Sequence, residues 1–400
     1  MKENDLLECT ITDEDNLGNG ISKIDNFVVF VKGVFKTEKI IIRLIKKEKH
    51  FAFGELIKVI KSSPKRENIK CPYFYSCGGC SFLHISEDKE INKKQKYISE
   101  LFNEYRVNNI ESVNIYNYRN KVTLHVCNGK LGFYQSNTNS LIEIDKCLLI
   151  SDEINKLIKL LKTFNLKNLN KIMIRETFYS KEILISFYGN LILDDLKKID
   201  KFNIKSIYLN NNLIKYNKSI KEKIGKLEFN IGNNSFFQVN TLCMEKLYQK
   251  IKEYAGTGDK LLDLYCGTGT IGMFLSDNFK SVLGVEIVKE SINNAKINKK
   301  INNIKNIEFI CGDAKIVKDN SFSCVVVDPP RSGLSKKVIN NLKSINTEKL
   351  IYVSCNPKTL KRDLKLLEEI YKVIEITPFN MFPRTNDVEC VCLLNKVGNW

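Results

Sequence analysis

The C-terminal part of this sequence predicts an α/β fold built on a doubly wound parallel sheet, and two observations support that prediction. After residue 227, short apolar runs that read as strands alternate with segments of helical length, which is typical of parallel sheets with right-handed crossovers. Two further runs, residues 371–376 and 388–394, would close the sheet as an antiparallel pair. The expected parallel strands are 261–265, 282–286, 307–310, 324–328 and 350–354, and the expected helices are 289–300, 336–342 and 357–369.

Residues 1–61 predict a separate domain of a different kind. Short β-rich runs follow one another between turn signals such as Gly18-Asn19-Gly20, which favours a small antiparallel, OB-like β-barrel. A module of this type either binds RNA or is a generic β domain, and the pattern alone leaves both interpretations open. The segment from Ser62 to Arg66 is expected to be a linker.

Residues 62–226 predict a central domain in which helical and strand patterns are mixed without a βαβ rhythm, and residues 227–400 form the third domain. The run Lys93-Lys94-Gln95-Lys96 lies in a helix-like segment of the central domain. Because charge runs on helices usually face water, we expect these side chains to form a solvated surface.

Composition restricts the classes of function. The chain has 63 Lys and Arg against 46 Asp and Glu, a net charge of +17, which favours a polyanionic partner and first of all nucleic acid. Residues 1–61 hold 11 basic and 10 acidic residues, so contacts to phosphates are expected mainly from the rest. No apolar run approaches the roughly 18 residues of a membrane span, and no secretory signal is visible. We therefore expect a soluble, cytoplasmic protein.

A glycine-rich loop follows the first expected parallel strand. Gly267-Thr268-Gly269-Thr270-Ile271-Gly272 fits G-x-G-x-x-G, and Glu286 ends the next strand 19 residues after Gly267. This pattern is typical of dinucleotide sites, where the carboxylate accepts hydrogen bonds from ribose, and S-adenosylmethionine sites use the same geometry. Asp263 and Tyr265 flank the loop. The rigid turn at Asp328-Pro329-Pro330 favours the methyl donor over NAD, because methyltransferases acting on nucleobases commonly place such a turn beside a planar target.

Cys355 is the candidate nucleophile. It follows the β-forming run Ile351-Tyr352-Val353-Ser354, which would deliver its thiol to the carboxyl edge of the sheet beside the glycine loop. A lone cysteine is more often a small buried hydrophobe than a catalyst. Its setting among the other loops favours the catalytic interpretation.

The ordered motifs resemble those of the RNA uracil-5-methyltransferase family over essentially the whole chain. They are Phe236-Phe237-Gln238-Val239-Asn240, Asp263-Leu264-Tyr265-Cys266-Gly267, Asp328-Pro329-Pro330-Arg331-Ser332-Gly333-Leu334, Ser354-Cys355-Asn356-Pro357-Lys358-Thr359-Leu360, and Phe382-Pro383-Arg384-Thr385 through Glu389. The resemblance implies a class I methyltransferase domain and an N-terminal TRAM domain that binds RNA. It also implies that S-adenosylmethionine is held by Gln238, Tyr265, Gly267, Glu286 and Asp328.

By the same resemblance, Cys355 adds to carbon 6 of uracil and Glu389 removes the proton from carbon 5 after methyl transfer. The sequence departs from the family pattern at Asp387, where histidine is usual, and at Leu83, where glutamine is usual. Neither position has been given a chemical role. The Asp387 difference raises the question of proton handling near Glu389.

Thirteen cysteines in a reducing compartment predict ligation, catalysis or burial rather than disulfides. Cys71, Cys77 and Cys80 form C-x5-C-x2-C, and Cys147 resembles the family's distal ligand. Four thiolates suit either structural zinc or a four-iron four-sulfur (4Fe-4S) cluster, and the resemblance favours the cluster. Because it lies outside the cofactor crevice, we expect it to serve structure or RNA positioning.

The sequence thus predicts a monomeric enzyme that forms 5-methyluridine in structured RNA after extruding the base. The TRAM-like domain favours 23S ribosomal RNA, with transfer RNA as the alternative. If only the glycine loop and the net charge are considered, two other classes of protein are also consistent with the sequence. An NAD-dependent oxidoreductase would make no use of Cys355, and an RNA-binding scaffold would use neither feature.

Overall fold

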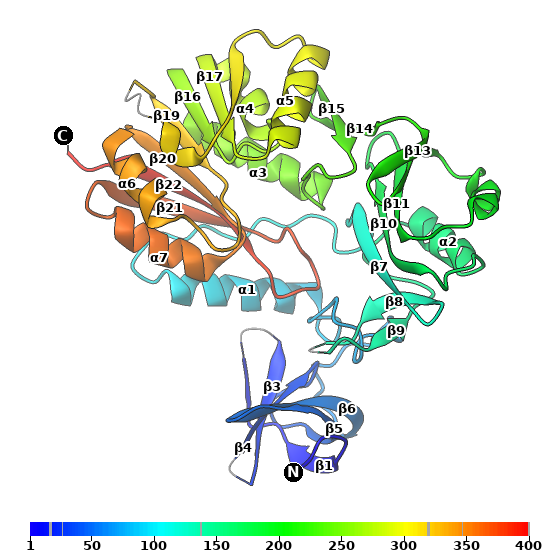
Figure 1. Cartoon of the computed structure of the whole chain (residues 1–400). Coiled ribbons are helices and arrows are strands. Elements are labelled where there is room, and N and C mark those ends of the chain that lie inside the picture. The colour runs from blue at the N-terminus through cyan, green and yellow to red at the C-terminus, as the bar shows by residue number, and fades with distance from the viewer. Residues whose placement is uncertain (16–17, 26, 137, 318–320, 346, 399–400) are drawn as a thin grey trace.

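The computed structural model describes residues 1–400 except 16–17, 26, 137, 318–320, 346 and 399–400. Three large sheets follow one another along the chain, an N-terminal sheet in blue, a central sheet in green and a C-terminal sheet from yellow-green to red (Figure 1). No helix in the described residues is both long and apolar enough to cross a membrane.

The C-terminal sheet has seven strands, which are β16 (Gly258–Leu264), β17 (Phe279–Glu286), β18 (Ile307–Cys311), β19 (Cys324–Val327), β20 (Lys349–Ser354), β21 (Tyr371–Phe379) and β22 (Glu389–Lys396). Their order is β18-β17-β16-β19-β20-β22-β21. The first five are parallel, and β22 runs antiparallel to both β20 and β21. The predicted doubly wound α/β sheet with its antiparallel end is confirmed.

Helices cover both faces of this sheet. One apolar core includes residues of α3 (Thr241–Ala255), α4 (Thr270–Leu275) and α5 (Lys289–Ile301). The other includes residues of α6 (Lys336–Ile345), α7 (Pro357–Leu367) and α1 (Glu87–Leu101). Short 3₁₀ turns are η1 (Leu193–Ile199), η2 (Ser276–Asn278) and η3 (Ala314–Ile316). Helix α1 therefore packs on the C-terminal sheet although its sequence lies in the predicted central domain.

The position of α1 corrects the expectation of a solvated Lys93–Lys96 surface. Lys94 is 3% exposed and pairs with Glu90 inside the protein, whereas the Lys96 side chain is 76% exposed. The expectation is wrong for Lys94 because α1 is covered on one side by the C-terminal domain. Successive residues of a helix point in different directions around its axis, so in a run of four charged or polar residues at least one side chain faces the covered side.

The central sheet has the order β13-β12-β11-β10-β7-β8-β9, with β7 (Lys121–Cys127), β8 (Lys130–Tyr134), β9 (Leu141–Glu143), β10 (Leu169–Glu176), β11 (Ile183–Gly189), β12 (Ile204–Leu209) and β13 (Asn212–Tyr216). Only β11 and β12 pair in parallel among the described strands of this sheet. Helix α2 (Asp152–Leu161) packs on one face through Ile154, Leu157 and Ile158. This arrangement agrees with the mixed α+β pattern of the sequence.

A separate hairpin, β14 (Ser219–Ile224) and β15 (Leu227–Gly232), spans the expected boundary between residues 226 and 227. Ile220 and Phe229 belong to the same core as α3 and α5. The hairpin therefore packs mainly with the C-terminal part, because alternation along each strand turns one apolar row toward that core.

The N-terminal sheet has the order β1-β5-β6-β4-β3-β2, with β1 (Leu6–Thr10), β2 (Asp13–Glu14), β3 (Asn19–Ile24), β4 (Phe27–Lys32), β5 (Lys39–Lys47) and β6 (Phe51–Lys61). It surrounds a small core that includes Val29, Val31 and Ile42. Strands β4 and β6 pair in parallel, so the expectation of an entirely antiparallel barrel is wrong at this pair. Strand β6 has 11 residues, which is long enough to pair with β5 along one edge and with β4 along the other.

The expected linker at 62–66 is anchored rather than free. Arg66 Nε donates to Glu38 Oε1 over 3.0 Å, and Arg66 Nη1 donates to the Gly33 carbonyl and the Tyr75 hydroxyl over 3.1 and 3.0 Å. Glu38 is 1% exposed. Lys32 Nζ also donates to the Cys77 carbonyl over 2.6 Å. The N-terminal sheet is thus fixed against the cysteine-rich segment 71–80.

Candidate active site

The strand order of the C-terminal sheet reverses between β16 and β19, which begin its two halves. In doubly wound folds, ligands bind outside the carboxyl ends of the strands at this point. Tyr265 follows β16 with a positive φ of 63°, and Asp328 follows β19. The Asp328 N–H donates to the Leu264 carbonyl over 3.3 Å, so the two strand ends lie side by side.

The glycine-rich loop connects β16 to α4. Gly267 has a φ of 54°, and a Cβ at this position would meet nothing within 4 Å, so the loop leaves open space there. The Gly267 N–H donates to Glu286 Oε2 over 3.2 Å, and the Val288 N–H donates to Glu286 Oε1 over 2.9 Å. Glu286 therefore joins the loops that follow β16 and β17. Its carboxylate lies at the position where a ribose would be recognised.

Four of the five residues predicted to bind the cofactor line one cavity. Gln238, Tyr265, Gly267 and Asp328 surround a space of about 30 Å³, and Glu286 lies behind Gly267.

Seven further residues line this cavity, and the sequence argument gave no role to three of them, Tyr248, Thr270 and Phe236. The hydroxyls of Tyr248 on α3 and Thr270 on α4 share a hydrogen bond of 2.7 Å across it. Phe236 is 64% exposed at the same place. The sequence did not reveal that Phe236 is exposed, because its neighbours are apolar. Tyr248 lies on the buried, apolar face of α3, where a tyrosine is normally expected to be part of the hydrophobic core.

Two carboxyl groups lie at this edge of the sheet, Asp263, which is buried, and Asp328, which is partly buried. Burial raises the pKa of Asp263 to about 8, although Asp263 Oδ2 accepts a hydrogen bond of 2.8 Å from the Gly272 N–H. Burial also raises the pKa of Asp328. Removing a carboxylate from water disfavours its charge, so both groups take up a proton more readily than exposed aspartates do.

Cys355 and Glu389 come together from neighbouring strands. Ser354 at the end of β20 pairs with Cys390 on β22. Cys355 and Glu389 are the next residues along these two antiparallel strands and therefore lie opposite each other. Burial raises the pKa of the Cys355 thiol to about 11, with further contributions from the negative charges of Glu389 and Asp328. Electrostatic contributions of this kind require the three groups to lie close together.

Glu389 is 2% exposed. Burial raises the pKa of its carboxyl well above the ordinary value, and the nearby charges of Asp328 and Asp387 act in the same direction. A carboxylate with a raised pKa is a stronger proton acceptor, which suits a general base. The two residues predicted to be catalytic thus stand next to each other beside Asp328.

Arg331 and Asp387 form an ion pair of 3.1 Å near these groups. The positive charge of Arg331 lowers the pKa of both Cys355 and Glu389 and so partly offsets their burial. Asp387 stands where the family pattern has histidine, and its carboxylate is engaged with Arg331. The sequence analysis included Arg331 in a motif but assigned it no role, because no neighbouring residue in the sequence indicated that it pairs with Asp387.

Cys71, Cys77, Cys80 and Cys147 line a second cavity of about 720 Å³ between the central sheet and segment 71–80. Leu83, the other departure from the family pattern, lines the same cavity. The sulfur donors suit a cluster, but within the described residues no three metal-ligating side chains stand close enough together to hold a metal ion.

Comparison with known proteins agrees with this geometry. The sequence model described as tRNA (uracil-5-)-methyltransferase matches residues 193–316 and 312–397. An uncharacterized RNA methyltransferase from Clostridium acetobutylicum is 38% identical, with 99% of this chain and 98% of that protein covered. A similarly described protein from Bacillus cereus is 33% identical over 99% of this chain and 98% of its own length.

Among solved structures, the tRNA (uracil-54, C5)-methyltransferase of Pyrococcus abyssi, crystallised with S-adenosyl-L-homocysteine, superposes with a TM-score of 0.83. It is 27% identical, and the alignment covers 97% of this chain and 99% of that one. Sequence and fold are therefore similar over nearly the full length. The chain belongs to the RNA (uracil-5-)-methyltransferase family.

Proposed function

We propose that this chain transfers a methyl group from S-adenosylmethionine to carbon 5 of a uridine in structured RNA, using Cys355 as nucleophile and Glu389 as base. The observation that supports this most is the adjacency of Cys355 and Glu389 on paired strands, beside Asp328 and the glycine loop. An NAD-dependent oxidoreductase would have no use for this thiol and carboxylate pair. An RNA-binding scaffold would need neither the pair nor the crevice.

The reaction proceeds in three steps on the uracil ring. After losing its proton, the Cys355 thiol adds to carbon 6, which makes carbon 5 nucleophilic enough to take the methyl group that S-adenosylmethionine supplies. Glu389 then accepts the proton from carbon 5, and the Cys355 sulfur leaves carbon 6 as the double bond reforms. The raised pKa of Glu389 favours this proton transfer.

Gln238, Tyr265, Gly267, Glu286 and Asp328 are the proposed binding residues for S-adenosylmethionine. Support comes from the shared cavity of four of them and from the similar enzyme that was crystallised with S-adenosyl-L-homocysteine. Glu286 would exchange its contacts to loop N–H groups for the ribose hydroxyls. The open space beside Gly267 would let the ligand approach the backbone.

The proposed substrate is 23S ribosomal RNA, on the resemblance of residues 1–61 to the TRAM domain of the ribosomal RNA enzymes. Transfer RNA is the second candidate, because the similar solved structure is that of a tRNA (uracil-54, C5)-methyltransferase. The alignment with that structure leaves only about 3% of this chain uncovered, which is much less than the length of the N-terminal sheet. The tRNA enzyme therefore has a counterpart of this sheet, and the presence of the sheet does not by itself distinguish ribosomal from transfer RNA as substrate. Mapping 5-methyluridine in 23S and transfer RNA, with and without the protein, tests the assignment; no protein-dependent 5-methyluridine in either RNA contradicts it.

Phosphate contacts are proposed on the central sheet. Arg119, Lys121 and Lys171 form no ion pair with a carboxylate of the described residues. Burial together with the positive charges of Arg175, Lys171 and Arg119 lowers the pKa of Lys121 to about 8, so these cations lie near one another. Arg175 is 2% exposed, so the proposed phosphate contacts are those of the other three. Uncompensated positive charge of this kind is neutralised well by RNA phosphates.

The N-terminal sheet is proposed to stack on unpaired bases through Phe30, Phe51 and Phe53. Their ring centroids lie 5.9 Å (Phe30–Phe51), 6.0 Å (Phe30–Phe53) and 5.5 Å (Phe51–Phe53) apart. Phe51 is 36% exposed. Base stacking on an aromatic ring contributes without neutralising phosphate, which suits a domain with almost balanced charge.

We expect the double substitution Phe51→Ala and Phe53→Ala to weaken binding of structured RNA by about 10-fold or more, since each stacked base contributes roughly 1–3 kcal/mol. The slope of log affinity against log salt should hardly change, because no phosphate contact is lost. Lys171→Ala on the central sheet serves as the contrast, as loss of a proposed phosphate contact should reduce that slope by about one. An unchanged affinity of the phenylalanine variant, measured by titration at several salt concentrations, contradicts the stacking role.

Cys71, Cys77, Cys80 and Cys147 are proposed to hold a 4Fe-4S cluster, on their all-sulfur donor set around one cavity. Protein purified without oxygen should be brown and contain about four iron atoms per chain. Cys77→Ser or Cys80→Ser should lose the iron and destabilise the central domain, because one ligand of the set is missing. Cys127→Ser is the matched control, since Cys127 is exposed and does not line the cavity. Zinc without iron in elemental analysis contradicts the cluster.

A further inference from the structure

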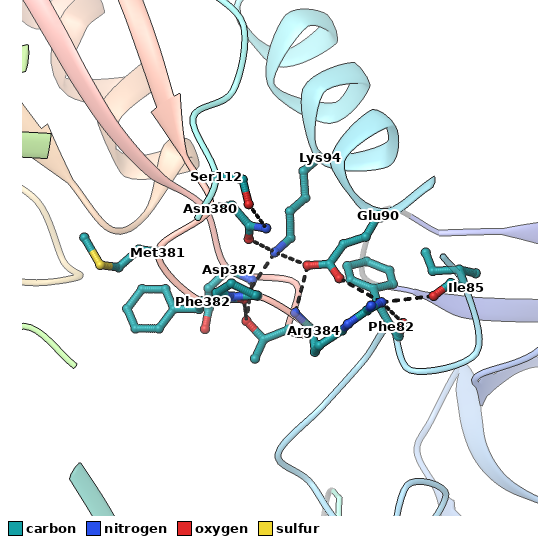
Figure 2. Close-up of polar contacts among 12 residues, drawn as sticks. Phe82, Ile85, Glu90, Lys94, Ser112, Asn380, Met381, Phe382, Arg384 and Asp387 are labelled. Carbon is teal, nitrogen blue, oxygen red and sulfur yellow. Dashed lines mark hydrogen bonds and ion pairs between the residues drawn. The ribbon is translucent and has the colours of Figure 1, made fainter. Parts of the chain in front are cut away.

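A buried ionic cluster connects helix α1 to the loop that precedes Glu389 (Figure 2). We call Glu90, Lys94 and Arg384 the α1 cluster, and these residues are 0%, 3% and 5% exposed. Glu90 and Lys94 are one turn apart on α1, and their Oε1 and Nζ atoms are 2.9 Å apart. Arg384 lies almost 300 residues later in the loop 380–388, which joins β21 to β22.

Lys94 binds the loop at two points in addition to Glu90. Its Nζ donates to Asn380 Oδ1 over 2.6 Å and to the Phe382 carbonyl over 3.2 Å (Figure 2). An ammonium group has three donors, and these contacts use all of them. Asn380 Nδ2 in turn donates to Ser112 Oγ over 3.2 Å. The start of the loop is therefore fixed by directional contacts.

Arg384 holds the middle of the loop in an unusual backbone conformation. Its φ is 66°, in the left-handed region that non-glycine residues rarely occupy. The Arg384 N–H donates to Glu90 Oε1 over 2.8 Å, and its carbonyl accepts from the Ser81 N–H over 2.7 Å. Its Nη1 donates to the Ile85 carbonyl over 3.0 Å. Strained conformations persist where the surroundings determine them several times over, and often at functional sites.

The loop ends at Glu389, whose carboxylate accepts no hydrogen bond from any described residue. Its position is therefore set by the backbone on either side. Phe379 at the end of β21 pairs with Glu389 in the strand register, and Asp387 is held by Arg331. The α1 cluster is one of several groups that hold the rest of the loop. The others include Asn240 Nδ2, which donates to the Met381 carbonyl over 3.2 Å, and the Tyr118 hydroxyl, which donates to the Pro383 carbonyl over 3.0 Å.

Burying three charged groups is costly, and apolar residues would pack α1 against the sheet without that cost. Apolar residues could not, however, fix the Asn380 side chain, the Phe382 carbonyl and the Arg384 N–H in defined directions. We propose that Glu90, Lys94 and Arg384 are positioning residues, which hold the loop 380–388 so that the Glu389 carboxylate reaches the carbon 5 proton of a uracil bound to Cys355. This inference rests on the proposed covalent reaction.

The test compares full-length Lys94→Met with wild type and with Glu389→Gln. In Lys94→Met the loop keeps its contact to Glu90 but loses the two contacts to the ammonium group. We expect kcat to fall about 10- to 100-fold, as for a misplacement of about 1 Å, while S-adenosylmethionine affinity and the KM for RNA change little. Because elimination is the step that needs Glu389, a covalent protein–RNA adduct should accumulate during turnover and be visible on a denaturing gel.

Two more variants separate positioning from stability. Lys94→Met alone leaves the buried Glu90–Arg384 ion pair of 3.4 Å intact. Glu90→Gln with Lys94→Met keeps an acceptor for the Arg384 N–H but leaves the Arg384 charge without its partner, so it should show the same adduct in a less stable protein. Lys96→Met is the matched control, since Lys96 forms an exposed pair with Glu100 on the same helix, and it should behave as wild type.

Wild-type turnover by Lys94→Met, a lowered kcat without adduct, or failure of Lys94→Met to fold would each overturn the positioning role. If Glu389→Gln itself accumulates no adduct, the proposed covalent reaction fails instead. The two ideas are therefore distinguished in one experiment.

Discussion

Replacing Cys355 with alanine should abolish methylation of RNA while S-adenosylmethionine still binds. The thiol makes the covalent bond to carbon 6, and without that bond carbon 5 is a poor nucleophile, so we expect the rate to fall by at least about 1,000-fold. The proposed cofactor residues lie on other loops, and the cavity that four of them share does not include Cys355. Calorimetry with S-adenosylmethionine and a single-turnover methylation assay measure the two properties separately.

Cys311→Ala is a suitable control for this experiment. Cys311 is an exposed cysteine at the end of β18, so its removal should leave the methylation rate unchanged. A Cys355→Ala enzyme that retains more than a few per cent of the wild-type rate would exclude Cys355 as nucleophile.

Glu389→Gln should trap the enzyme on its RNA after one methyl transfer. Glutamine has nearly the shape of glutamate but cannot accept the carbon 5 proton, so addition and methylation proceed while elimination stops. Incubation with radiolabelled S-adenosylmethionine should give a slow-migrating protein–RNA band that carries about one methyl group per enzyme. Multiple-turnover product formation should fall by at least about 100-fold, in the range of a lost general base.

The double variant Cys355→Ala with Glu389→Gln provides the control for the trapped species. It should bind RNA but give no band, because the sulfur that forms the bond is missing. A normal rate of product release by Glu389→Gln, or a band that persists without Cys355, would assign the base or the nucleophile to other residues.

Local patterns in the sequence were sufficient for much of the C-terminal sheet. The strand expected at 350–354 is β20 (Lys349–Ser354), and the helix expected at 289–300 is α5 (Lys289–Ile301). Buried parallel strands are continuous apolar runs, and helices between them are long enough to be recognised, so both signals are local. The loops that carry Gly267, Asp328 and Cys355 follow directly from the ends of these strands.

Contacts between distant segments could not be read in the same way. The parallel pairing of β4 with β6 depends on how the N-terminal sheet bends, which no local run of residues records. Lys94 looked like part of a solvated surface because its neighbours in sequence are charged. Its partners Asn380 and Phe382 lie almost 290 residues away, and only packing of α1 on the C-terminal sheet brings them together.

The sequence by itself determined the α/β fold, the family, and the residues proposed to carry the reaction, because residue type and order along strands and loops are local properties. Tertiary structure decided which of these groups meet. The register of β20 with β22 brings Cys355 beside Glu389, and burial then raises the pKa of both. It also decided that a buried ionic cluster on α1 holds the loop before Glu389, since burial and charge pairing arise only when distant elements pack together.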